Sequence, residues 1–260
     1  MRSILVIADR TPAMSARLES ALSLARANDG HVTVLVNTPL TRYIAMDPMG
    51  GSHLAAEALN QALADDEALA ASIRDRLGTQ DVPFDVLHSE AEPVDAIAQE
   101  ARFADVVVMS RVGDMAGDVA LTCRTPVLVV EDERVLGFPV NRACIAWDGG
   151  NEAASALRFA APVLAGCGQV DVLTVIEKEG GFPATDALRY LSRHGVKAEL
   201  REVPRTGSTE ESLHVAVRQA GADLLVMGAY GKSRMREFLF GGVTRFMLSG
   251  NGGPALLLAH

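Results

Sequence analysis

Two copies of one apolar motif organise this sequence: Ala104-Asp105-Val106-Val107-Val108-Met109-Ser110 and Ala222-Asp223-Leu224-Leu225-Val226-Met227-Gly228. A second similarity follows each copy, where Thr125-Pro126-Val127-Leu128-Val129-Val130 resembles Gly253-Pro254-Ala255-Leu256-Leu257-Leu258. In a chain of 260 residues, this repeat predicts two units of about 130 residues each. Short apolar runs of this kind are typical of strands that are buried on both faces of a parallel sheet.

The two halves show the same alternation of predicted strands and helices. Apolar runs predict strands at 4–8, 32–36, 82–87, 105–109 and 126–130, and again at 144–147, 170–175, 196–203, 224–227 and 255–258. Helical spacing predicts helices at 13–27, 53–77 and 93–102, and again at 151–164, 184–194, 209–220 and after residue 241. This order predicts an α/β fold of two tandem, doubly wound, parallel five-stranded sheets of Rossmann-like type.

The predicted domains are residues 1–133 and 140–260. The segment between them is the predicted linker, because residues 131–141 are charged and include Gly137 and Pro139. The last strand of each domain, 126–130 and 254–258, is predicted to pair with the other across a pseudo-twofold axis, which would cover two apolar sheet edges. A homodimer of the whole chain is compatible with this arrangement.

Composition excludes several classes of function. The net charge of −9 argues against nucleic-acid binding, and no apolar run reaches the ~20 residues that span a membrane. The N-terminal apolar run ends at Asp9 and is too short for a signal peptide, while three cysteines without CxxC spacing fit a reducing cytoplasm. The six histidines show no metal-ligand spacing, and neither a nucleophile elbow nor a Walker-type loop is present, so no catalytic or metal-ligating residue is predicted.

The halves differ after the repeated motif. Between the repeated motif and the second similarity, the first half has 14 residues (111–124) and the second half has 24 (229–252). The longer segment contains the spacing G-x2-G-x9-G, formed by Gly228, Gly231 and Gly241, and is rich in basic residues. Glycines let backbone N–H groups approach an anion closely, and a helix beginning at 241–242 would add its positive end and the hydroxyl of Thr244. The other interpretation is that the glycines form tight turns without a ligand.

The glycine segment also resembles a known signature. Gly228-Ala229-Tyr230-Gly231, followed after nine residues by Gly241-Gly242-Val243-Thr244, is similar to the nucleotide-binding signature of the universal stress proteins. Because the resemblance extends over both halves, the chain is identified as a tandem member of that family. The resemblance implies an adenine nucleotide alpha-hydrolase-like fold with a pocket for ATP, ADP or AMP, accompanied by Mg²⁺, and a role in the stress response.

The resemblance also implies which residues hold the nucleotide. It places Asp148 against the adenosine and Val175 beside the adenine, and it includes Met227, which precedes the glycine loop. It places the phosphates at Gly228, Gly231, Gly241, Gly242, Val243 and Thr244. One position departs from the family, because Gly242 stands where a Ser or Thr is usual, so one hydroxyl is missing.

The first half lacks the second glycine element. Ser110-Arg111-Val112-Gly113 is followed by no counterpart of 241–244, so this half is predicted not to bind nucleotide. Asp9, which corresponds to Asp148, is instead expected to cap the turn into the first helix. Two other functions stay open. One is a slow ATPase or related hydrolase, disfavoured because no general base is evident at the loop, and the other is a nucleotide-free interaction protein.

Overall fold

The computed structural model describes residues 1–44, 53–111, 115–176, 184–230, 242–250 and 252–260. In the first half the elements are β1 (Ser3–Ile7), α1 (Ala13–Asn28), β2 (His31–Asn37), α2 (Leu40–Ile44), α3 (His53–Leu77), β3 (Phe84–Ser89), α4 (Pro93–Glu100), η1 (Ala101–Phe103), β4 (Val106–Ser110), α5 (Met115–Thr122) and β5 (Val127–Val130). In the second half they are β6 (Arg142–Ala146), α6 (Asn151–Leu164), β7 (Gln169–Ile176), α7 (Thr185–Arg193), β8 (Ala198–Pro204), α8 (Thr209–Ala220), β9 (Leu224–Gly228), α9 (Gly242–Ser249) and β10 (Ala255–Ala259).

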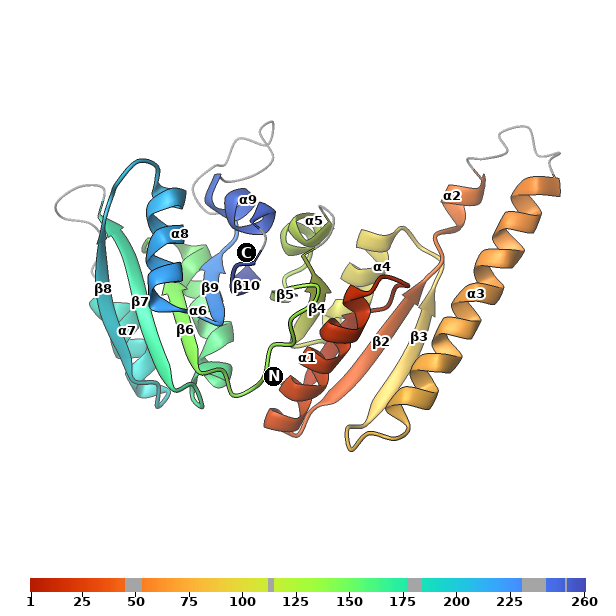
Figure 1. Cartoon of the computed structure of the whole chain (residues 1–260), viewed down its shortest axis with the longest axis horizontal. Helices are drawn as coiled ribbons and strands as arrows, with labels where there is room; N and C mark the ends of the chain where they lie inside the picture. Colours follow the sequence, from red (N-terminus) through yellow and green to blue (C-terminus); the bar gives the residue numbers. More distant parts are fainter. Residues whose placement is uncertain (45–52, 112–114, 177–183, 231–241, 251) are drawn as a thin grey trace.

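The strands join into one continuous sheet, in the order β3-β2-β1-β4-β5-β10-β9-β6-β7-β8 (Figure 1). Neighbouring strands are parallel within each half, so the predicted pair of five-stranded parallel sheets is confirmed. The halves meet where β5 and β10 pair antiparallel, with Leu128 opposite Leu257. The predicted edge-to-edge pairing is therefore also confirmed, and it gives the backbone groups of both strands their hydrogen-bond partners.

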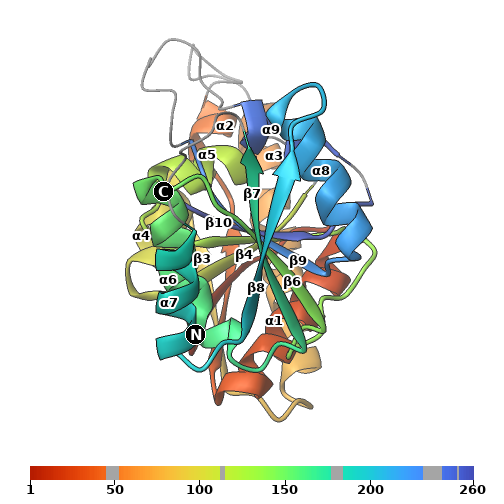
Figure 2. The same cartoon turned by 90° about the vertical axis from the view of Figure 1, so that its left-hand side faces the viewer.

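Helices cover both faces of this sheet. One apolar cluster packs α1, α3, α6 and α7 against it, and a second packs α4, α5, α8 and α9 against the opposite face. Both clusters contain residues of the two halves, so each layer of the core runs across the β5–β10 junction. Figure 2 looks along the sheet and shows its strands fanning out, as the regular twist of neighbouring strands requires.

The register of the last strands corrects one equivalence drawn from the repeat. Val107 pairs with Val127, and Leu225, which corresponds to Val107 in the repeated motif, pairs with Leu256. Val127 therefore corresponds to Leu256, whereas the similarity of the two sequences placed it at Ala255. The error of one residue has a physical cause. These strands are buried on both faces, so their sequences lack the alternation that would set the register.

Candidate functional site

Three strand ends of the second half lie at one edge of the sheet. Ala146, the last residue of β6, pairs with Leu173 of β7 and with Met227 of β9. Asp148 follows Ala146 by two residues, and Val175 follows Leu173 by two residues, so this register brings both to the edge where β9 ends. Because β6 is the first strand of its half and later strands add on both of its sides, this is the position where open α/β sheets bind ligands.

Asp148 lies in the turn between β6 and α6. Its Oδ1 accepts a hydrogen bond from the backbone N–H of Gly150 at 2.8 Å, and its side chain is exposed. Gly149 has a φ of 74°, a conformation that favours glycine, so the turn directs the chain into α6 directly after the carboxylate. An exposed carboxylate in this position can accept hydrogen bonds from a ligand's hydroxyl groups.

Gly228 has a packing role that the sequence did not indicate. A Cβ on Gly228 would lie 2.6 Å from the backbone nitrogen of Ala153 and 2.6 Å from the carbonyl carbon of Glu152. The first turn of α6 therefore rests directly on the end of β9, and this contact requires a glycine whether or not a ligand is bound. The preceding Met227 is 3% exposed and is part of the core, whereas Val175 is partly buried against the same cluster.

The start of α9 follows the glycine loop. Gly242 is exposed, Val243 is partly buried, and Thr244 is only 2% exposed. The Oγ1 of Thr244 accepts a hydrogen bond of 3.5 Å from the backbone N–H of Tyr230, so it connects the end of β9 with the start of α9. Gly231 and Gly241, the other glycines of the predicted phosphate loop, lie outside the described residues.

Tyr230 is a residue at this site that sequence reasoning missed. It has a φ of 64°, in a region where residues other than glycine are uncommon. Burial, with a smaller contribution from the negative charge of Asp118 on α5, raises the pKa of Tyr230 to about 12. Tyr230 also packs against the apolar cluster to which α5 contributes, so the tyrosine of the second half lies near a helix of the first half. A tyrosine within a glycine-rich segment gave no signal of such a contact.

The corresponding position in the first half is filled by its own side chains. Asp9 accepts hydrogen bonds from the backbone N–H and the hydroxyl of Thr11, which confirms its expected capping role at the turn into α1. Arg17 of α1 is 3% exposed, and it forms an ion pair with Asp9 at 2.7 Å. Its other terminal nitrogen donates to the hydroxyl of Ser110 at 3.0 Å. Arg17 thus bridges the ends of β1 and β4.

The corresponding positions of the second half carry different residues. Arg17 follows Asp9 by eight residues (17 − 9 = 8), and the residue eight positions after Asp148 is Ala156 (156 − 148 = 8). Ala156 is fully buried on α6, and the counterpart of Ser110 is Gly228. Alanine and glycine therefore stand where the first half has a guanidinium and its hydroxyl acceptor.

Arg17 also changes the titration of Asp9. Burial by itself would raise the pKa of this carboxyl, but the hydrogen bond from the Thr11 hydroxyl and the charge of Arg17 outweigh it, so the pKa is lowered below 3.8. A carboxyl whose pKa is lowered in the folded state stabilises the protein at pH values above the carboxyl's ordinary pKa. That contribution is lost as the pH falls through the folded-state value.

We expect Arg17→Met to lower the free energy of unfolding by about 2 kcal/mol, less than for a fully buried pair because the Asp9 side chain is 38% exposed. Urea unfolding at pH 7 measures this loss, and Arg26→Met, which breaks the exposed pair with Asp81, serves as the control. The deficit should be complete at pH 7 and should shrink below pH 3.8 as Asp9 becomes protonated. A deficit independent of pH would mean that Arg17 acts by packing alone.

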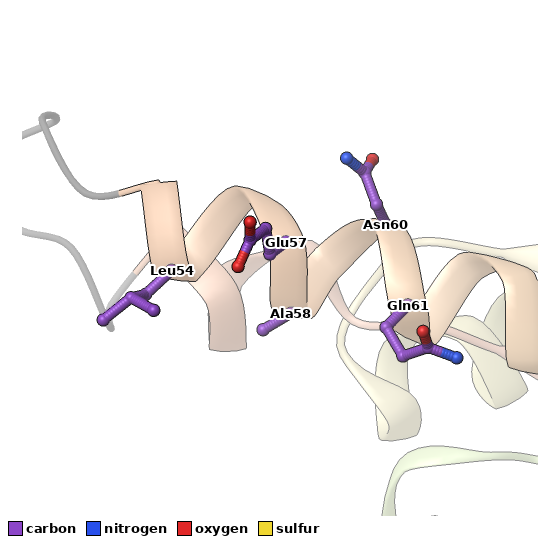
Figure 3. A pocket seen from close by; sticks show the side chains of 5 residues that line it. All are labelled: Leu54, Glu57, Ala58, Asn60 and Gln61. Carbon is purple, nitrogen blue, oxygen red and sulfur yellow. The ribbon is translucent and has the colours of Figure 1, made fainter.

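Other sites are not indicated in the described residues. No group of three or more His, Cys, Asp or Glu side chains in this part of the chain could hold a metal ion. Within the same residues, no helix has the length and apolar character needed to cross a membrane. A hollow of about 610 Å³ lies along α3, lined by Leu54, Glu57, Ala58, Asn60 and Gln61 (Figure 3). None of the predicted site residues lines it.

Comparison with known proteins assigns both halves to one family. Residues 1–131 and 139–250 each match the model of the universal stress protein family. A universal stress protein from Archaeoglobus fulgidus DSM 4304 is 15% identical with a TM-score of 0.75, over 98% of this chain and 97% of the other. A putative universal stress protein from Pseudomonas aeruginosa UCBPP-PA14 is 16% identical with a TM-score of 0.59, over 100% and 93%.

A third solved structure is that of a universal stress protein in complex with cAMP. It is 19% identical, has a TM-score of 0.35, and covers 46% of this chain and 97% of its own. A comparison with curated proteins found no match. At these identities the two full-length likenesses show a shared fold.

Proposed function

The chain belongs to the universal stress protein family in both of its halves, and from this premise we propose that its second half binds an adenine nucleotide and serves in the stress response. The observation that carries the proposal is the difference between the two strand-end positions. In the first half Arg17 fills the space between Asp9 and Ser110, whereas in the second half the corresponding residues are Ala156 and Gly228.

The described residues suggest a role for each part of the nucleotide. The exposed carboxylate of Asp148 would accept hydrogen bonds from the ribose hydroxyls, and Val175 would border the adenine. The backbone N–H groups at the start of α9, at Gly242 and Val243, have no partners within the helix and would face the phosphates together with the positive end of the helix. Backbone N–H groups and the positive end of a helix can stabilise phosphate charge even where no basic side chain contributes.

Two further components come from outside the described residues. The sequence places Lys232, Arg234 and Arg236 in the glycine segment, and these cations complement a triphosphate. Mg²⁺ is proposed as the companion ion of ATP. It would be held mainly by phosphate oxygens and water, as is usual for this ion, because the described residues offer no cluster of acidic ligands.

Calorimetric titration of the whole chain with MgATP tests the proposal. We expect saturable binding of one nucleotide per chain, competition by ADP and AMP, and no comparable competition by GTP. The absence of any titration signal would instead support a nucleotide-free interaction protein. Sustained release of phosphate would support the ATPase interpretation.

We also propose a cytoplasmic location and an intramolecular pseudo-dimer of the two halves, to which a homodimer of the whole chain can be added. All three cysteines are free, and two of them are buried, which fits a reducing compartment. The edge strands β5 and β10 already pair with each other within the chain. A homodimer would therefore have to use another surface, and sedimentation analysis would detect it.

A further inference from the structure

Arg111 lies at the junction between the two halves. It follows β4 directly, and its backbone N–H bonds the carbonyl of Val130 at 3.1 Å. Ala229 holds the corresponding place after β9, and its N–H bonds the carbonyl of Ala259 at 2.8 Å. The backbones of the two halves thus match here, and the side chains differ.

The guanidinium of Arg111 reaches into the second half. Its two terminal nitrogens donate to the carbonyls of Met247, in α9, and of Pro254, just before β10, the latter at 2.7 Å. Its Nε lies 2.6 Å from Oε1 of Glu131 in an ion pair, although the angle is not that of a hydrogen bond. Glu131 in turn accepts from the backbone N–H of Gly252 at 3.3 Å.

These contacts hold the C-terminal end of α9. The Arg111 side chain is 5% exposed, so its charge needs close partners, and it finds both a carboxylate and carbonyl oxygens. The carbonyls of the last helical turn lack partners within the helix and form its negative end, which a cation stabilises. The planar guanidinium presents donors on three separate nitrogens toward two carbonyls and a carboxylate, whereas the donors of a lysine all lie on one nitrogen.

The arrangement is not repeated in the other direction. Ala229 has no side chain that could reach α5, the helix of the first half that corresponds to α9. Glu131 corresponds by sheet register to His260, whose Nδ1 lies 3.0 Å from the carbonyl oxygen of Ala229 within its own half. Arg111 of the first half therefore contacts α9 of the second half, the helix that follows the glycine segment.

We infer that Arg111 is a positioning residue for the phosphate end of the nucleotide site, an inference that rests on the proposed function. α9 has eight residues and is about 12 Å long, so contacts at its two ends together set its direction. When Arg111 holds its last turn and Thr244 holds its first turn to Tyr230, the N–H groups of Gly242 and Val243 keep a fixed direction. The degenerate half thereby preorganises the site of the other half.

The test compares MgATP with adenosine, which lacks phosphates. Arg111→Met should weaken MgATP binding roughly tenfold, a typical size for coupling through packed contacts, while adenosine binds as well as in the unchanged protein. Arg111→Lys keeps the charge but loses the fork of donors on separate nitrogens. The affinity of this variant for MgATP should therefore lie between those of Arg111→Met and the unchanged protein. Glu131→Gln leaves the contacts to α9 in place and serves as a milder variant if Arg111→Met folds poorly, with a smaller loss confined to MgATP.

Arg134→Met is the matched control, because Arg134 also pairs with a residue of the second half, Asp223 at 2.8 Å, but is 63% exposed and far less confined. It should leave both affinities unchanged. Equal losses for MgATP and adenosine in Arg111→Met, or no loss for either, would overturn the inference while leaving the proposed function intact. Failure of the unchanged protein to bind either ligand would overturn both.

Discussion

Gly228→Ala is expected to lower the free energy of unfolding by about 3 kcal/mol, the upper part of the range for overpacking a closely packed position. The added Cβ would lie 2.6 Å from backbone atoms of Glu152 and Ala153. Backbone atoms cannot rotate away as a side chain can, so α6 or the end of β9 has to shift. Urea unfolding, followed by circular dichroism, measures the loss.

Gly242→Ala is the matched control for this substitution. Among the described residues, the nearest neighbour of a Cβ on Gly242 is the Oε1 of Glu210 at 3.8 Å, which is an ordinary contact distance. Because alanine is also a better helix former than glycine, Gly242→Ala should be neutral or slightly stabilising. Stability of Gly228→Ala equal to that of the unchanged protein would show that α6 can move away from β9 at little cost.

Asp148→Ala is expected to weaken the binding of MgATP about 30-fold, as the loss of hydrogen bonds to a charged group would do. The carboxylate is exposed and accepts a hydrogen bond from the nearby Gly150. Because it is exposed, its removal should cost the fold little. Calorimetric titration measures the affinity, and thermal unfolding checks the stability of the same sample.

Asp9→Ala provides the control in the other half of the chain. Asp9 is engaged by Thr11 and Arg17, so this substitution should reduce stability and leave MgATP affinity unchanged. Asp148→Ala should therefore reduce MgATP affinity and not stability, whereas Asp9→Ala should reduce stability and not MgATP affinity. Loss of MgATP affinity in Asp9→Ala but not in Asp148→Ala would reverse the proposed assignment of the halves.

Much of the architecture followed from local pattern. The apolar runs of four to eight residues and the helices between them predicted parallel sheets, because such runs are stable only when both faces are covered. Boundaries were less accurate, since the strand expected at 82–87 is β3 at Phe84–Ser89 and the helix expected at 93–102 ends in the short η1. The register of the last strand was one residue wrong, because an apolar run does not indicate which neighbour it pairs with.

The site was predictable only in part. Asp148, Val175 and Gly228 lie at one edge of the sheet, because parallel strands of one half end at the same edge, and their binding of a nucleotide stays a prediction. The packing role of Gly228, the bridge formed by Arg17 and the crossing of Arg111 were not predicted. Each depends on a contact between elements far apart in the sequence, such as Arg17 with Ser110 or Arg111 with Met247.

By itself, the amino-acid sequence determined that the chain has two similar α/β halves and that one of them carries a glycine segment the other lacks. These features depend on periodicity, spacing and residue type, which are local properties of the chain. Only the tertiary structure decided that Arg17 fills the strand-end position of the first half. It likewise decided that Arg111, from the same half, holds α9 of the second half. Buried cations are placed by their partners, and those partners become neighbours only when the sheet brings distant strand ends together.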